Sequence, residues 1–141
     1  MDGALPLGSR MKLLLDTHIW IWAIETPQKL GRAVRRQIER PGNELYLSPV
    51  SIWEAHMLVQ HKRLRLRRGF TEWLDEVLET TPLREAPFNF AVAEQAAGIQ
   101  LRQSDPGDLF LAATALVFDL TLVTADEQLL DCPGLKTLSN D

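Results

Sequence analysis

The regular alternation of short apolar runs with longer helix-forming stretches constrains the fold of this chain more than any other feature. Strand-like runs are predicted at residues 12–15, 45–47, 83–86, 121–123 and 135–138. Helical spacing of apolar residues, with breaks at proline and glycine, predicts helices at residues 17–24, 30–38, 49–60, 70–78, 90–101, 106–118 and 126–130. Such alternation builds βαβ units, so the sequence predicts an α/β fold with a mostly parallel central sheet flanked by helices.

The chain has the size and composition of a single domain. It contains 141 residues, 45% of them hydrophobic, which is enough for a packed core. We assign residues 11–141 to this domain and interpret residues 1–10 as an N-terminal extension, left by cloning or by an early start codon. No apolar run is long enough to cross a bilayer, and we find no signal peptide. The single cysteine, Cys132, cannot form an internal disulfide, which favours the reducing cytoplasm.

Acidic residues gather where predicted strands end and helices begin. Asp16 follows the first strand, Asp126 follows the fourth, and Glu54 lies on the apolar face of helix 49–60. Asp105 and Asp108 open the helix that precedes the fourth strand. The carboxyl ends of parallel strands meet at one edge, and carboxylates crowded there would repel one another without a cation. Ligands that are all oxygen atoms favour Mg²⁺ or Mn²⁺, so the sequence predicts such a site.

Each of these acids also has a purely structural interpretation. Asp16 and Asp105 occupy positions where a side chain caps a helix, and Asp126 could be a plain surface acid. Thr124 and Glu127 have the spacing of a capping box. Glu54 could pair with a nearby arginine or lysine, since a buried carboxylate needs a partner.

A basic segment, HKRLRLRR at residues 61–68, contrasts with the net charge of −4. An acidic chain is mildly unfavourable for a protein that binds nucleic acid irrespective of sequence. One basic strip can still hold a phosphate backbone if a metal ion masks the carboxylates. We therefore consider Arg63, Arg65, Arg67 and Arg68 as substrate contacts, with a solvated loop as the alternative.

Aromatic residues give a weaker signal. The four tryptophans could stack on bases, but at helical spacing among aliphatic residues they more commonly form the core or a dimer interface. Trp20 and Trp22 differ by about 200° around a helix, so one of them faces away from the core. An exposed aromatic side chain of this kind predicts a symmetric homodimer. His56 and His61 are five residues apart and no cysteine pair exists, which argues against zinc.

Four short motifs carry the predicted acids: LLLDTHIWIW at residues 13–22, SPVSIWEA at 48–55, SDPGDLFLAATA at 104–115 and LVTADEQL at 122–129. Together they resemble the PIN-domain family, in particular the VapC-type toxins of bacterial toxin–antitoxin pairs. Each motif is short, but the four occur in the order and register of the family. The resemblance covers nearly everything from Met11 to the end of the chain.

The resemblance implies a parallel α/β fold, endoribonuclease activity with a metal-activated water, and pairing with a cognate antitoxin. Its catalytic and metal-binding acids correspond to Asp16, Glu54, Asp108 and Asp126, with Asp105 as an additional ligand. Thr124 matches the hydroxyl residue before the last acid. The sequence departs from many relatives at Gly107-Asp108-Leu109, where an aromatic residue and an arginine commonly flank the aspartate. The missing arginine removes one phosphate contact and leaves the substrate open.

Two other functions compete with this interpretation. An aspartyl phosphatase would use Asp16 as nucleophile, but its acid/base aspartate would stand where this chain has His18. A non-catalytic RNA-binding module of the same fold is the other alternative. Retention of all the acids argues against such a module.

Overall fold

The structure is a computed structural model in which residues 10–102 and 105–141 are described. The predicted N-terminal extension, apart from Arg10, lies outside the described residues. The elements in chain order are β1 Lys12–Leu15, α2 Thr17–Glu25, η1 Pro27–Lys29, α3 Arg32–Glu39, β2 Glu44–Leu47, α4 Pro49–Gln60, α5 Phe70–Thr80, β3 Leu83–Glu85, α6 Phe90–Ala97, α7 Pro106–Phe118, β4 Thr121–Thr124, α8 Glu127–Leu130 and β5 Thr137–Ser139. None of these helices is long and apolar enough to cross a membrane.

The five strands form one sheet in the order β3-β2-β1-β4-β5, and every pairing is parallel. The sheet is thus entirely parallel over the described residues, and the predicted α/β fold is confirmed. From β1 the chain builds outward through β2 and β3, then returns to add β4 on the other side of β1. The crevice at the carboxyl ends of β1 and β4 is therefore a topological switch point, where α/β proteins bind ligands.

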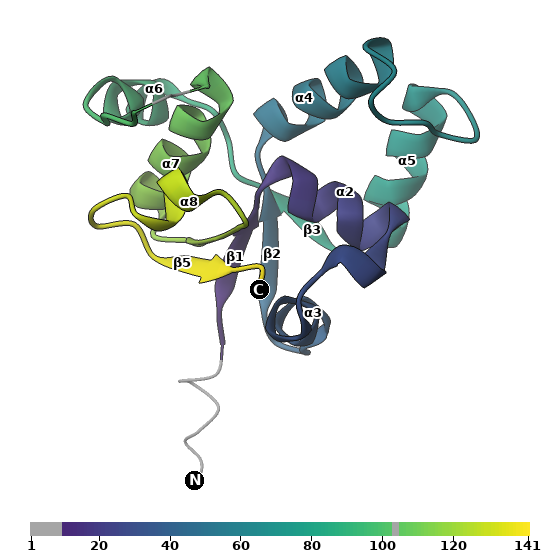
Figure 1. Cartoon of the computed structure of the whole chain (residues 1–141), viewed down its shortest axis with the longest axis horizontal. Helices are drawn as coiled ribbons and strands as arrows, with labels where there is room; N and C mark the ends of the chain where they lie inside the picture. The colour runs from purple at the N-terminus through teal and green to yellow at the C-terminus, as the bar shows by residue number, and fades with distance from the viewer. Residues whose placement is uncertain (1–9, 103–104) are drawn as a thin grey trace, which may run out of the picture.

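Helices cover both faces of the sheet, with α2 to α5 on one side and α6 to α8 on the other (Figure 1). Successive side chains of a strand point to opposite faces. On β1, Leu13 and Leu15 join the core beneath α2, α4 and α5, which includes the buried indoles of Trp20 and Trp73. Leu14 points the other way, into a core with Leu111 of α7. The strand itself is buried on both faces, as a central parallel strand must be.

The predicted elements are all present, but several boundaries were wrong. The helix predicted over residues 90–101 ends at Ala97, because Gly98 forms its C-cap. The helix predicted from residue 30 begins at Arg32, after a 3-10 turn at Pro27–Lys29 that the sequence pattern did not predict. The last strand is Thr137–Ser139 rather than residues 135–138.

Candidate active site

Asp16 stands at the carboxyl end of β1, directly beside the end of β4. Its backbone N–H donates to the carbonyl of Val123 at 3.1 Å, which extends the β1–β4 pairing by one residue. Although Asp16 is the N-cap residue of α2, its side chain makes no capping hydrogen bond. Its Oδ2 accepts a hydrogen bond of 2.6 Å from the hydroxyl of Thr124 instead. Asp16 thus takes the N-cap position predicted for it without capping through its side chain, and Thr124 holds the carboxylate instead.

Glu54 is held from α4 by residues of two other helices. Thr17 of α2 donates a hydrogen bond of 2.5 Å to Glu54 Oε1, and its oxygen lies 2.8 Å from the hydroxyl of buried Ser51. The other oxygen of Glu54 packs against Gly107 of α7, where an added Cβ would collide with the carboxylate. Glu54 has no arginine or lysine ion pair among the described residues, so its partner is a threonine hydroxyl.

The start of α7 brings two more carboxylates to the site. Asp105 is the N-cap of α7 and accepts a hydrogen bond of 3.2 Å from the N–H of Gly107. Its structural role as a cap is thus confirmed, and its side chain still borders the pocket. Asp108 follows in the first turn and is half-buried in the same pocket.

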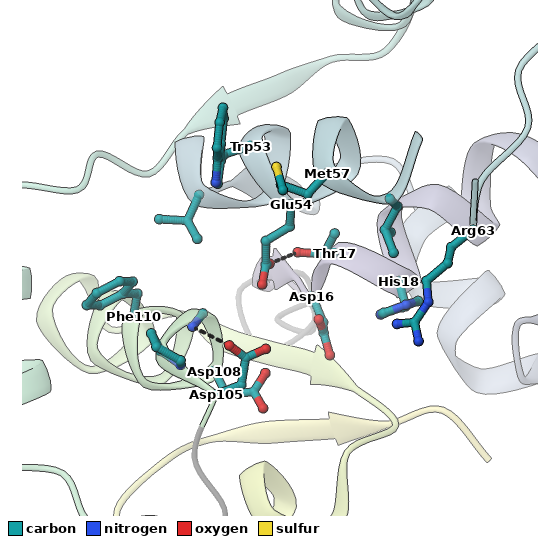
Figure 2. A pocket seen from close by; sticks show the side chains of 14 residues that line it. Asp16, Thr17, His18, Trp53, Glu54, Met57, Arg63, Asp105, Asp108 and Phe110 are labelled. Carbon is teal, nitrogen blue, oxygen red and sulfur yellow. Dashed lines mark hydrogen bonds between the residues drawn. The ribbon is translucent and has the colours of Figure 1, made fainter. Parts of the chain in front are cut away.

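These side chains line a cavity of about 490 Å³ (Figure 2). Asp16, Glu54, Asp105 and Asp108 all border it, so the structure brings together four of the five predicted acids. Asp126 is not part of its lining. It caps α8 by accepting from the N–H of Gln128 at 2.8 Å, and its own N–H donates to Thr124 at 3.0 Å. The predicted capping box from Thr124 to Glu127 is wrong, since the cap is Asp126.

Burial and mutual repulsion raise the pKa values of Asp16, Glu54 and Asp108. The pKa of Asp108 rises to about 7, mainly by desolvation and then by the negative charges of Asp126, Asp16, Asp105 and Glu54. Desolvation also raises the pKa of Asp16 and of Glu54, although hydrogen bonds from Thr124 and Thr17 oppose the change. Asp126 therefore contributes charge to the site although it does not line the cavity.

A hard divalent cation fits the donor chemistry of this pocket. The charged ligands it offers are carboxylate oxygens, which Mg²⁺ and Mn²⁺ prefer. Within residues 10–102 and 105–141, no three His, Cys, Asp or Glu side chains converge tightly enough to be a ready-made metal cluster. The pocket suits a cation because its carboxylates are crowded: a bound cation would relieve the repulsion that raises the pKa of Asp108.

The arginines of the basic segment after α4 line different clefts. Lys62 adopts a left-handed conformation (φ 60°) that ends the helix, and the N–H of Arg63 donates back to the carbonyl of Leu58 at 2.8 Å. This turn places Arg63 at the acidic pocket, while Arg65 lines the neighbouring cleft. Arg67 and Arg68 lie at a third cleft beside α5, where Arg68 forms an ion pair with Glu76. Of the four predicted substrate contacts, Arg63 and Arg65 therefore border the acidic pocket or the cleft next to it, whereas Arg67 and Arg68 border a separate cleft.

Several residues of the site were missed or undervalued in the sequence. Thr17 and Gly107 hold Glu54 in place, and both stand directly beside a predicted acid, which was the available signal. His18, Trp53 and Phe110 also line the pocket. Trp53 is one of the four tryptophans that the sequence offered as base-stacking residues, His18 adjoins the predicted acidic edge, and the signal for Phe110 was its proximity to Asp108.

Comparison with known proteins agrees with this architecture. The family model described as PIN domain matches residues 13–135. The chain is 30% identical to Ribonuclease VapC22 of Mycobacterium tuberculosis over 118 residues, which cover 83% of this chain and 88% of the relative.

Solved structures share the fold. VapBC2 from Rickettsia felis, bound to a DNA fragment from its promoter, has a TM-score of 0.65 and 20% identity, over 93% of this chain and all of the other. FitAcB from Neisseria gonorrhoeae has a TM-score of 0.61 and 24% identity, over 91% of this chain and 97% of the other. The match to the family model over most of the chain and the similarity to VapC22 establish that this protein belongs to the PIN-domain family.

Proposed function

We propose that this protein is an endoribonuclease that depends on Mg²⁺ or Mn²⁺ and acts as the toxin of a toxin–antitoxin pair. The observation that carries the proposal is the convergence of Asp16, Glu54 and Asp108 on one pocket at the switch point of a PIN-domain sheet. The name of the 30% identical relative, Ribonuclease VapC22, supports RNA as the substrate.

In the proposed mechanism, Asp16, Glu54 and Asp108 would hold the cation, and Asp105 and Asp126 would add negative charge around it. A divalent ion bound there would polarise a phosphodiester and lower the pKa of an attacking water. Hydrogen bonds from Thr124 and Thr17 fix two of the carboxylates before substrate arrives.

An arginine and a histidine complete the proposed substrate site. Arg63 and His18 line the cavity together with the acids. A guanidinium group there can hold a phosphate next to the one that is cut.

The test is cleavage of a total RNA pool by purified protein, with Mg²⁺, with Mn²⁺ and with a chelator. We expect cleavage only with metal, and its loss in Asp16→Asn and in Asp108→Asn. Asp119→Asn is the matched control, because Asp119 is an exposed acid that pairs with Lys136 away from the site. Full activity of either site variant would refute the assignment. Hydrolysis of a small phosphomonoester without RNA cleavage would favour a phosphatase, and RNA binding without cleavage would favour a binding module.

We propose an antitoxin as the protein partner, because a toxin–antitoxin complex from Klebsiella pneumoniae and VapBC-5 from Mycobacterium tuberculosis, a member of the VapBC family of toxin-antitoxin systems, share the fold. A cleft of about 340 Å³ that contains Trp22 and Leu64 adjoins the acidic pocket and shares Arg63 and His18 with it. We propose that the C-terminal segment of the antitoxin lies along this groove and brings an Arg or Lys to the carboxylates. A complex that kept full ribonuclease activity would refute this arrangement.

We also propose that the protein is a cytoplasmic homodimer. Trp20 is buried and Trp22 is partly exposed, so Trp22 is the tryptophan of α2 that faces away from the core. Large exposed aromatic residues such as Phe90 supply further apolar surface for association. Light scattering that shows a monomer at micromolar concentration would refute the dimer.

A further inference from the structure

Trp53 is the most exposed of the four tryptophans, although it lies directly beside the acidic pocket. Its side chain is 61% exposed, whereas Trp20 and Trp73 are buried in the core. It comes from α4, immediately before Glu54, and lines the same cavity as the carboxylates. A large apolar ring at the rim of a charged pocket has no evident role in the core, so we asked what it could contact.

The orientation of the Trp53 ring is supported from behind by other aromatic residues. His56, one turn further along α4, lies 5.5 Å from it between ring centroids. His56 in turn contacts Phe70 at 5.2 Å, and Phe70 contacts buried Trp73 at 5.9 Å. Offset and edge contacts of this kind stabilise ring pairs. The exposed indole is therefore backed by a row of rings that leads into the core.

A second aromatic side chain lines the same cavity from the opposite wall. Phe110 belongs to α7, is partly buried, and packs against Phe88 with ring centroids 4.7 Å apart. Figure 2 shows Trp53 and Phe110 on one side of the carboxylates, with Arg63 and His18 on the other side. The pocket is thus aromatic at one end, acidic in the middle and basic at the other end.

This order matches the chemistry of a single strand of nucleic acid. Bases stack on aromatic faces, and phosphates pair with basic side chains. We propose that Trp53, with Phe110 opposite it, binds a base adjacent to the phosphate that is cut, while Arg63 binds a phosphate on the other side. This inference rests on the proposed ribonuclease function and names the part of the pocket that would set its preference for particular nucleotides.

The main alternative is that Trp53 contacts a second copy of this chain. Among the described residues, the most exposed large apolar side chain is Phe90, which is 95% exposed, lies on α6 and is not part of the pocket lining. An interface between two copies could therefore form around Phe90 and would not need Trp53. The mixed aromatic and charged lining around Trp53 favours a nucleotide instead.

The test measures binding of short single-stranded RNA to Trp53→Ala, Trp53→Phe and the control Phe90→Ala, each in a cleavage-inactive Asp108→Asn background with Mg²⁺. We expect affinity to fall about tenfold in Trp53→Ala, as for loss of one stacked base, with recovery in Trp53→Phe and no change in Phe90→Ala. RNA should also quench the indole fluorescence of the protein, and this quenching should largely vanish in Trp53→Ala.

An oligonucleotide with one abasic position refines the test. The abasic site is moved along the RNA one position at a time. At one position, the abasic RNA should bind the parent protein more weakly than intact RNA does, whereas Trp53→Ala should bind the abasic and the intact RNA equally. Equal affinity of Trp53→Ala and its parent would overturn the proposal, as would a shift of Trp53→Ala from dimer to monomer in light scattering. If the wild-type protein neither cuts nor binds RNA, the proposed function itself fails, which separates the two conclusions.

Discussion

At the scale of single residues, the ionisation of Asp108 links the site to the stability of the fold. Its pKa is raised to about 7 in the folded protein, and the pKa values of Asp16 and Glu54 are raised as well. An unfolded chain releases the Asp108 proton near pH 4, its ordinary value. Between about pH 4 and pH 7 the folded protein therefore binds more protons than the unfolded one, and its stability falls as the pH rises.

We predict that the metal-free protein has a lower melting temperature at about pH 8 than at about pH 5, and that Asp108→Asn reduces this difference. Thermal melts followed by circular dichroism in a chelating buffer measure it. Asp119→Asn is the control, because the hydrogen bond from Lys136 lowers the pKa of Asp119 below its ordinary value, so Asp119 stays ionised in the folded and the unfolded chain throughout this pH range. Asp119→Asn should also tolerate the left-handed backbone at this position (φ 55°). An Asp108→Asn protein with the same pH dependence as wild type would contradict the prediction.

Gly107 makes a second prediction at the residue scale. A methyl group there would collide with the carboxylate of Glu54, the mobile end of a side chain, so we expect Glu54 to move and the fold to remain. Gly107→Ala should keep or slightly raise the melting temperature, since alanine favours helices. Its Mg²⁺-dependent RNA cleavage should fall about tenfold or more, as when a group that orients a ligand is lost. Gly98→Ala is the control, because its nearest neighbour would be 3.7 Å away. Undiminished cleavage by Gly107→Ala would argue against a role for Glu54 in the site.

At the scale of elements, the end of α4 decides which arginines reach the substrate. We predict that Arg63→Ala lowers the salt dependence of RNA binding by about 0.7 in the slope of log affinity against log salt, the effect of one single-strand phosphate contact. Arg68→Ala should leave that slope unchanged, since Arg68 pairs with Glu76 on α5. Fluorescence anisotropy titrations at several salt concentrations measure both. Equal slopes for Arg63→Ala and wild type would assign Arg63 to partner contact or solubility.

The same helix end illustrates what the sequence could and could not predict. Elements were predictable because their signals are local, such as Ser48 capping α4 and Asp105 capping α7. Asp16, Asp105, Asp108 and Asp126 were predictable because each follows a strand or opens a helix, and Glu54 because it places a carboxylate on the apolar face of a helix. The contact of Thr17 with Glu54 joins residues 37 positions apart, so it depends on how α2 packs on α4. The direction of Arg63 likewise depends on the left-handed backbone at Lys62, and a lysine does not predict that conformation.

At the scale of the whole molecule, the two ends of the described chain are tied to the sheet by different means. Lys12–Leu15 is the central strand, with β2 on one side and β4 on the other. The C-terminal strand β5 is an edge strand of three residues, none of them fully buried. Backbone pairing alone gives such a strand little resistance to local opening.

Asn140, directly after β5, supplies additional long-range contacts. Its Oδ1 accepts from the N–H of Gly31 at 2.6 Å, and its Nδ2 donates to the carbonyl of Lys29 at 3.1 Å. Its backbone N–H donates to the carbonyl of Thr124 at 3.1 Å. One amide side chain therefore joins the end of the chain to the connection between α2 and α3, next to the strand that carries Thr124.

We predict that Asn140→Ala lowers the free energy of unfolding by about 1–3 kcal/mol, the net value of two hydrogen bonds, and increases amide hydrogen exchange in β5. Urea unfolding and exchange measured by mass spectrometry check the two effects. Ser139→Ala is the control, because Ser139 makes an exposed hydrogen bond to Asp141 that should add little. Backbone hydrogen bonds hold Thr124 within β4, so we expect Asn140→Ala to lower the stability of the protein but to leave its metal-dependent cleavage largely intact. If Asn140→Ala unfolded like wild type and β5 exchanged no faster, the edge strand would be held by packing of Leu138 against the core instead.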